Sequence, residues 1–278
     1  MQYSPFNVST GVEMDQSILV LTPISNSRNF LDQYFRLLCS LTYPHNLITI
    51  ALGEDSSTDG TYQYALEMAE TFAPYFRDIQ VHKLDPPRVA PIPYGSRHRL
   101  NIQQIRRSHM AMARNQLLLR AMADEDWALW IDVDMVFYPA TLVEHLKSTH
   151  APIVVPNCLS SHPTMEKYFI YDRNTWRETN ASRHYLEDAP EDYLQVEGYG
   201  PSRRRFLAEI IDEGLVVPLD GVGGCVLLVE GARHRDGLIF PPFVFDHHVE
   251  TEGLAKMATK MNLSIAGLPF VNTVHKSS

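Results

Sequence analysis

The stretch WALWIDVDMVFYP (127–139) joins an apolar run directly to two carboxylates. WALWI (127–131) has the length and apolar character of a buried β-strand. Asp132 and Asp134 follow at its carboxyl end, and alternate side chains of extended backbone share a face. Two carboxylates set between apolar segments cost free energy unless something compensates their charge. The stretch therefore predicts a strand that ends in a paired acidic site.

A divalent-metal site is the chemical interpretation of this pair. Mg²⁺ and Mn²⁺ prefer carboxylate and phosphate oxygens, so two carboxylates and a diphosphate could together complete a coordination shell. We therefore expect Asp132 and Asp134 to hold a metal against the diphosphate of a nucleotide-sugar. A polar turn after a buried strand is the simpler alternative, and it stays open because Asp-x-Asp alone is a short motif.

The sequence before this stretch alternates between strand and helix patterns. Strands are expected at 17–23, 47–53 and 79–84, and helices at 29–41, 62–76 and 103–123, the second of them ending near Pro74. Such alternation is typical of an α/β fold with a mostly parallel sheet. The proline-rich stretch 85–99 between the third strand and the long helix is expected to be a loop.

Polar residues follow three of the expected strands at their carboxyl ends: Thr22-Pro23, Glu54-Asp55 and Asp132-Asp134. Ligands of open α/β sheets bind beyond the carboxyl ends of the strands. The three polar loops should therefore meet in one crevice.

The second half of the chain has a looser pattern. Strands are expected at 153–157, 225–229, 264–268 and 270–274, and a helix at 250–261, whereas 160–215 shows no clean period. We expect an N-terminal extension (1–16) and a single domain (17–278). Its nucleotide-binding half would be 17–157 and its acceptor half 158–278.

Basic residues gather on and before the long helix. Arg107 and Arg114 are seven residues apart and so lie nearly on one helix face, with Arg106 beside them. Arg97, His98 and Arg99 precede them in the loop. A guanidinium binds two phosphate oxygens at once, which favours anion binding. A solvated basic helix face is the alternative.

Two further segments carry candidate groups. DGVGG (220–224) would let the backbone approach a ligand closely, with Asp220 as a candidate carboxylate, or would form a tight turn. FDHHVETEGLAK (245–256) contains Asp246, His247, His248, Glu250 and Glu252 but lacks a known metal-site spacing, so carboxylates at a helix start are its simpler interpretation.

Composition excludes several classes of protein. A formal net charge of −9 argues against a nucleic-acid partner. Cys39, Cys158 and Cys225 lie far apart, which indicates buried free thiols rather than a zinc or disulfide framework. We find neither a signal peptide nor an apolar run near the ~20 residues of a membrane span. Sequons at Asn7, Asn180 and Asn262 are compatible with a secretory lumen.

Taken together, these segments resemble the fungal α-mannosyltransferases of the mannan polymerase complex, of the Golgi α-1,6-mannosyltransferase type. The matching stretches run in order from about residue 17 to 275. They are SILVLTPISN, SLTYPHNLI, LGEDSSTDGT, MARN, WALWIDVDMVFYP, IVVPN, VEGY, LDGVGGCVLLV, FPPF to ETEGLAKMA, and GLPFVNTVH. The region 160–215 matches least well.

The resemblance implies a GT-A-type fold, with a Rossmann-like mixed sheet flanked by helices. It implies a retaining enzyme with GDP-mannose as donor, Mn²⁺ (or Mg²⁺) as metal and an α-mannoside acceptor of mannan or an N-glycan outer chain. Other mannosyltransferase subunits are the implied protein partners. The implied location is the Golgi lumen, although this sequence shows no anchor and would otherwise be soluble and cytoplasmic.

The resemblance also assigns residues. Asp132 and Asp134 match its metal-binding carboxylates, and His275 matches the histidine that completes the metal shell. The positions that match nucleotide-binding loops and the facing helix are Thr22, Pro23, Glu54, Asp55 and Arg114. Asp220 and Glu252 match acidic positions near the sugar. Arg114 or Arg107 would assist the leaving diphosphate.

Two other functions stay open. The chain could be a non-catalytic scaffold or sugar-binding subunit of a mannosyltransferase complex. A sugar-nucleotide-forming nucleotidyltransferase is disfavoured, because such enzymes need a glycine-rich loop after the first strand and this chain has TPISNSRN there.

Overall fold

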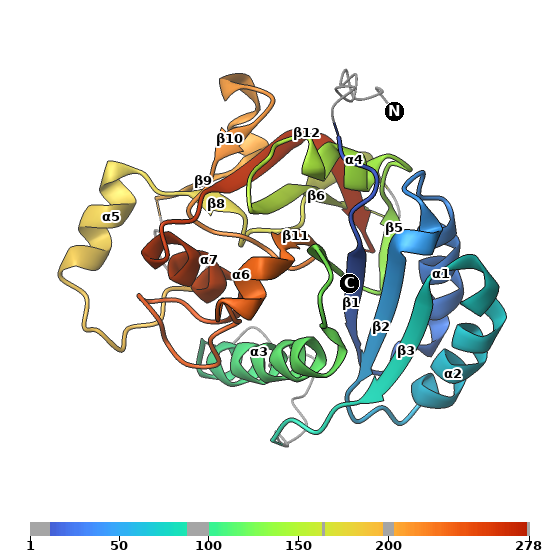
Figure 1. Cartoon of the computed structure of the whole chain (residues 1–278). Coiled ribbons are helices and arrows are strands. Elements are labelled where there is room, and N and C mark those ends of the chain that lie inside the picture. Colours follow the sequence, from blue (N-terminus) through green and yellow to red (C-terminus); the bar gives the residue numbers. More distant parts are fainter. Residues whose placement is uncertain (1–11, 88–99, 163–164, 197–202, 277–278) are drawn as a thin grey trace.

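One mixed ten-stranded sheet runs through the molecule (Figure 1). The computed structural model describes residues 12–87, 100–162, 165–196 and 203–276. The strand order is β10-β12-β6-β11-β4-β1-β2-β3, with β5 paired to β12 and β7 paired to β6. The predicted boundary between the two halves, at residues 157 and 158, falls inside β6, so both halves contribute to the same sheet.

The first half forms the parallel side of the sheet, as predicted. Its strands are β1 (Ile18–Ile24), β2 (Ile48–Glu54), β3 (Asp78–Lys83) and β4 (Trp127–Ile131). Ile18 pairs with Ile48 on one side and with Trp127 on the other. The strands therefore start together, and their carboxyl ends lie at one edge.

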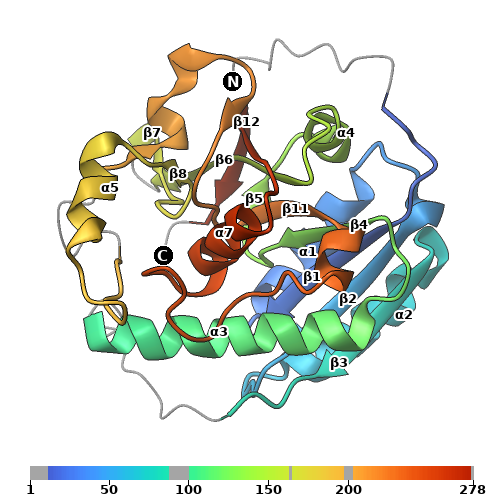
Figure 2. The ribbon, with the colours of Figure 1, turned by 60° about the vertical axis from the view of Figure 1, so that its left-hand side comes forward.

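Helices cover both faces of the sheet, which explains why its central strands are apolar throughout. Ile18 and Val20 pack toward α1 (Leu31–Cys39), α2 (Thr61–Phe72) and α4 (Leu142–Lys147). Leu19 and Leu21 pack toward α3 (Leu100–Ala121) and α7 (Glu250–Lys260). Figure 2 shows α3 crossing the sheet on this second face, with α6 (Gly231–Arg235) and α7 beside it.

The rest of the sheet is mixed in direction, because β12 runs parallel to β6 while the other pairings are antiparallel. The strand β11 (Val226–Glu230) lies antiparallel between β4 and β6 (Ile153–His162). The remaining partners are β5 (Met135–Phe137), β7 (Met165–Ile170), β10 (Val217–Pro218) and β12 (Ile265–His275). The two closing strands expected at 264–268 and 270–274 are one strand, β12. Its pairing with β6 shifts between Leu268 and Asn272, where Pro269 lacks a backbone donor.

Much of the region 160–215, where the sequence shows no clean period, consists of short elements. They are β8 (Trp176–Arg177), α5 (Asn180–Glu187) and β9 (Arg205–Phe206), with 3-10 turns at Leu207–Glu209 and Ile211–Glu213. In the first half, 3-10 turns occur at Arg28–Phe30, His45–Leu47 and Ala73–Tyr75. The last of these follows α2 and contains Pro74, near which this helix was expected to end.

Three further points concern the cysteines, the basic loop and membrane spans. Cys158 and Cys225 are buried and Cys39 is half-buried, all as free thiols. Arg97, His98 and Arg99 lie outside the described residues. In the part of the chain that the structure describes, none of the helices combines the length and apolar character that spanning a bilayer requires.

Candidate metal and nucleotide site

Asp132, Asp134 and His275 meet at the carboxyl edge of the sheet. Their ligand atoms all lie within 4.8 Å of one another. The two carboxylates follow β4, and β5 then turns back to pair with β12, which places Met135 opposite His275. His275 Nε2 lies 2.8 Å from Asp134 Oδ1 and 3.9 Å from Asp132 Oδ2. The strand pairing therefore brings the last residue of β12 to the acidic pair.

The surroundings of this cluster fit a metal ion. Burial raises the pKa of Asp132 to about 6, although the charges of Arg114 and His275 lower it. Burial alone would lower the pKa of His275, but its hydrogen bond to Asp134 and the charges of both aspartates raise it. The Nδ1–H of His275 donates to the Lys276 carbonyl at 2.7 Å, which leaves Nε2 as the ligand atom.

Arg114 from α3 joins the acidic pair to α7. Its guanidinium lies 3.6 Å from Asp132 Oδ1 and 3.3 Å from Glu250 Oε1. A Cβ on Gly224 would lie 2.5 Å from Arg114 Nη2, so the glycine makes room for this side chain. Arg114 is thus a buried cation held next to a carboxylate of the candidate metal site.

A cavity of about 310 Å³ opens beside this cluster. The predicted residues that line it are Pro23, Asp55, Arg114, Asp132 and Asp134. Arg106 and His109 of α3 line it as well, and His109 Nε2 lies 2.5 Å from Asp55 Oδ2. The polar loops after β1, β2 and β4 therefore meet around one cavity, as the strand-end argument predicts.

Thr22 and Glu54 lie behind this cavity and have partners of their own. The buried Thr22 hydroxyl donates to the Ile131 carbonyl at 2.8 Å and lies 2.8 Å from the Tyr34 hydroxyl. Glu54 accepts a hydrogen bond from the Ser57 N–H at 2.5 Å. Both shape the loops around the cavity, and a direct contact with a nucleotide stays a prediction for both.

Arg107 and Glu252 pair with each other. Arg107 Nη1 lies 2.5 Å from Glu252 Oε2, and Arg107 Nη2 lies 3.2 Å from Asn174 Oδ1. Glu252 is 0% exposed and also accepts from the Trp176 indole N–H at 2.8 Å. Their predicted roles at the diphosphate and the sugar stay predictions, whereas the contacts indicate a structural pair between α3 and α7.

Asp220 and the histidine-rich segment also make contacts within the protein. Asp220 Oδ2 accepts from the Glu178 N–H at 2.8 Å. His248 is buried and lies against Arg204 Nη2 at 2.5 Å, and burial followed by that charge holds its pKa well below the ordinary value. Glu250 and Glu252 open α7, as expected for carboxylates at a helix start, but they pair with arginines of α3.

Sequence reasoning missed Tyr171 and Asp172. The Tyr171 ring stacks on His275 with centroids 4.0 Å apart and an interplanar angle of 14°. A Cβ on Gly223 would collide with the Asp172 carboxylate, so this glycine of DGVGG lets the half-buried acid approach. Burial raises the pKa of Asp172. Both residues follow β7, in the region without a periodic pattern that could have signalled them.

Comparison with known proteins places this geometry in context. A family model described as Anp1 matches residues 5–244. The chain is 32% identical over 282 residues to the mannan polymerase complex subunit mnn9 of Schizosaccharomyces pombe, spanning 96% of this chain and 82% of the relative. It is 32% identical to the subunit MNN9 of Candida albicans, spanning 91% and 73%.

Solved glycosyltransferase structures share the fold. The mannosyltransferase PcManGT from Pyrobaculum calidifontis, in complex with GDP-Man and Mn²⁺, aligns with a TM-score of 0.54 and 15% identity over 94% of this chain and 56% of that chain. GalNAc-T7 with UDP, GalNAc and Mn²⁺ aligns with a TM-score of 0.57 and 12% identity, over 94% and 44%. The predicted GT-A-type fold is confirmed.

Proposed function

The chain belongs to the Anp1 family, and from that premise we propose that it transfers mannose from GDP-mannose to an α-mannoside acceptor. The observation that carries the proposal is the cluster of Asp132, Asp134 and His275 with Arg114 at the edge of a cavity. Its relatives bear the names of mannan polymerase subunits, and a structural neighbour was solved with GDP-Man and Mn²⁺. We place the reaction in the Golgi lumen, with mannan or an N-glycan outer chain as acceptor.

The donor set favours Mn²⁺ over Mg²⁺. Asp132 and Asp134 offer oxygen ligands, and His275 offers a neutral imidazole nitrogen, a ligand that first-row transition metals accept more readily than Mg²⁺ does. When bound, the metal would neutralise charge on the leaving diphosphate. Arg114 would add a second positive charge, and Glu250 keeps its guanidinium in place. Arg107 would assist only by rearranging its pairing with Glu252.

For the sugar end of the site, two carboxyls are candidates for the group that supports a retaining transfer. Asp220 is the one indicated by the sequence, and it is partly exposed but bonded to the Glu178 backbone. Asp172 is the one added by the structure, and it lies against Gly223. In an oxocarbenium-like transition state, a nearby carboxylate stabilises the developing positive charge. Both are proposals for this role.

Metal binding should weaken in acid. Asp132 and His275 must lose their protons to act as ligands, and the pKa of each is raised, to about 6 for Asp132. Protons therefore compete with the metal as the pH falls through about 6. We expect the apparent Kd for Mn²⁺ to rise roughly ten-fold or more between about pH 7.5 and 5.5. Electron paramagnetic resonance of free Mn²⁺ measures it, and a flat profile over this range would contradict the assigned ligands.

Product analysis tests the function itself. The purified chain, incubated with GDP-mannose, Mn²⁺ and short α-mannosides, should form an α-linked product one mannose longer, identified by mass spectrometry and anomeric NMR signals. Omitting Mn²⁺ or adding a chelator is the matched control and should stop the reaction. Exclusively β-linked product, or turnover of UDP-sugars alone, would refute the proposal.

A non-catalytic role is the second candidate, because the relatives are named as subunits of complexes. A subunit that only binds partners or sugar has no need of a metal-dependent donor site. Calorimetric titration with GDP-mannose separates the two: binding that requires Mn²⁺ supports the enzyme, whereas absence of metal-dependent binding supports the scaffold. The mannosyltransferase subunits of such a complex are the proposed protein partners in either case.

A further inference from the structure

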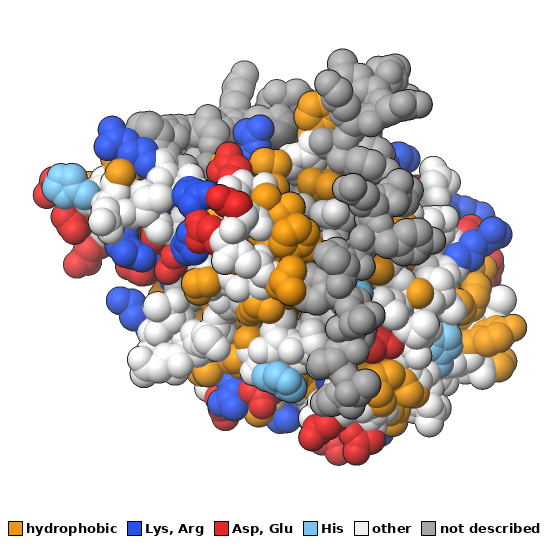
Figure 3. Space-filling model, turned by 90° about the horizontal axis from the view of Figure 1, so that it is seen from above, with side chains coloured by type: hydrophobic (Ala, Val, Ile, Leu, Met, Phe, Trp, Pro, Cys, Tyr) orange, Lys and Arg blue, Asp and Glu red, His pale blue; other side chains and the backbone are white. Residues whose placement is uncertain are grey.

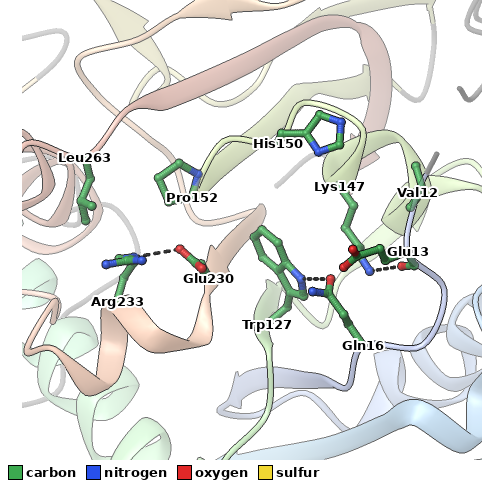
Figure 4. Close-up of a pocket in the computed structure, with 10 residues that line it drawn as sticks. All are labelled: Val12, Glu13, Gln16, Trp127, Lys147, His150, Pro152, Glu230, Arg233 and Leu263. Carbon is green, nitrogen blue, oxygen red and sulfur yellow. Dashed lines mark hydrogen bonds and ion pairs between the residues drawn. The ribbon is translucent and has the colours of Figure 1, made fainter.

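A second and larger cavity, of about 450 Å³, lies at the opposite end of the sheet. Trp127 opens β4 and lines this cavity, whereas Asp132 directly follows the end of the same strand. Five residues of extended chain span roughly 17 Å, so the cavity is separate from the metal cluster. Figure 4 shows its lining, which comes from the segment before β1, the starts of β4 and β6, and the end of β11 with α6.

Trp127 gives this cavity an aromatic wall. Its indole is half-buried, and its Nε1–H donates to Gln16 Oε1 at 2.8 Å. That bond fixes the orientation of the ring and leaves its face, rather than its donor, available to a ligand. Pro152 and Leu263 add further apolar surface (Figure 4). Ring faces of this kind suit a ligand that presents C–H groups.

Polar groups with spare hydrogen-bonding capacity surround this wall. Glu230 and Arg233 form an ion pair of 2.8 Å, and their side chains are still 36% and 31% exposed. Arg233 also pairs with Asp236 at 3.2 Å, yet a guanidinium and a carboxylate keep N–H groups or lone pairs that these contacts do not consume. His150 is exposed at the rim. These planar groups suit neighbouring hydroxyls that both donate and accept.

The charges of the lining cancel. Glu13 and Glu230 oppose Lys147 and Arg233. The Lys147 ammonium is buried, bonded to the Glu13 carbonyl and to the Tyr43 hydroxyl. In the uncovered part of Figure 3, acidic and basic side chains likewise lie next to one another rather than in patches of one sign. A phosphate or another anion would find no net attraction here.

We propose that this cavity is a second carbohydrate site, which takes an uncharged oligosaccharide. An aromatic face, apolar neighbours and balanced planar polar groups together match a ligand made of hydroxyls and C–H faces. The assignment to α-mannosides rests on the proposed function. The site would hold an acceptor glycan away from the reacting end and so raise its effective concentration at the enzyme.

Tryptophan fluorescence can report this site selectively. The chain has three tryptophans, and Trp130 and Trp176 are both 0% exposed, which leaves Trp127 as the one that a ligand can touch. Titration of α-mannohexaose into the chain, without donor and with a chelator, should change the emission in a saturable way. Maltohexaose is an equally neutral oligosaccharide. Its Kd should be at least about ten-fold higher than that of α-mannohexaose, a factor worth 1.4 kcal/mol.

Substitutions in the cavity test whether the emission change comes from this site. Trp127→Phe should remove the emission change, and Glu230→Gln should raise the Kd for α-mannohexaose several-fold. Glu70→Gln on the exposed face of α2 is the matched control and should bind as the native chain does. If neither sugar changes the emission, or maltohexaose binds as tightly as α-mannohexaose, the proposal is overturned. Since donor and metal are absent, an active transferase without this signal would overturn the second site alone.

Discussion

Asp134→Asn is expected to reduce mannosyl transfer at least about 1,000-fold, roughly 4 kcal/mol of transition-state stabilisation. Asparagine keeps the shape of the side chain but removes the charge that would hold a divalent cation beside Asp132 and His275. The Asp134 side chain is 32% exposed, so the fold loses little packing. Asp132→Asn should behave in the same way, with an added loss of the Arg114 contact at 3.6 Å.

Three measurements make this result interpretable. Initial rates with GDP-mannose give the loss, calorimetry gives the affinity for Mn²⁺, and thermal unfolding tests the fold. Asp124→Asn, at an exposed carboxylate in the turn before β4, is the matched control and should leave all three unchanged. Full Mn²⁺-dependent activity in Asp134→Asn would show that this residue is not a metal ligand. If the variant is less stable, its rate is measured at a lower temperature at which it is folded.

The acidic pair could be located from sequence because its signal is local. An apolar strand followed by alternating carboxylates predicts both a strand end and a shared face, and β4 confirms the strand. His275 lies far along the chain and no spacing connects it to the pair. Its place there depends on the antiparallel pairing of β5 with β12, a long-range feature that only the family resemblance could indicate.

The arginines show where helical periodicity stops being informative. Arg107 and Arg114 share a face of α3, as predicted, but seven residues of helix span roughly 10 Å. Both arginines reach carboxylates at the start of α7, Glu250 for Arg114 and Glu252 for Arg107. At that separation, however, Arg114 also lies next to Asp132, whereas Arg107 does not. Arg106, one residue away, lines the cavity instead. Which turn of a helix meets which neighbour is set by packing of distant segments.

Glu252→Ala is expected to destabilise the fold by about 3–5 kcal/mol, the usual cost of removing one partner from a buried ion pair. Glu252 is fully buried and accepts from the Trp176 indole at 2.8 Å and from Arg107 at 2.5 Å, with Arg204 Nη1 at 3.5 Å. Removing the carboxylate leaves these buried donors without their shared acceptor. Chemical unfolding in urea measures the loss, and Glu70→Ala on the exposed face of α2 is the control.

Glu252→Gln decides between this structural role and the role near the sugar that the family resemblance implies for Glu252. The amide keeps one acceptor oxygen for Trp176 but no longer neutralises Arg107, so a structural role predicts a stability loss between those of alanine and the native residue. Transfer per folded molecule should then fall only modestly at low temperature. Native stability combined with a loss of transfer of about 100-fold or more would assign Glu252 to the chemistry instead. The geometry favours the first outcome, because a carboxylate enclosed by two guanidinium groups and an indole has no face left for a sugar.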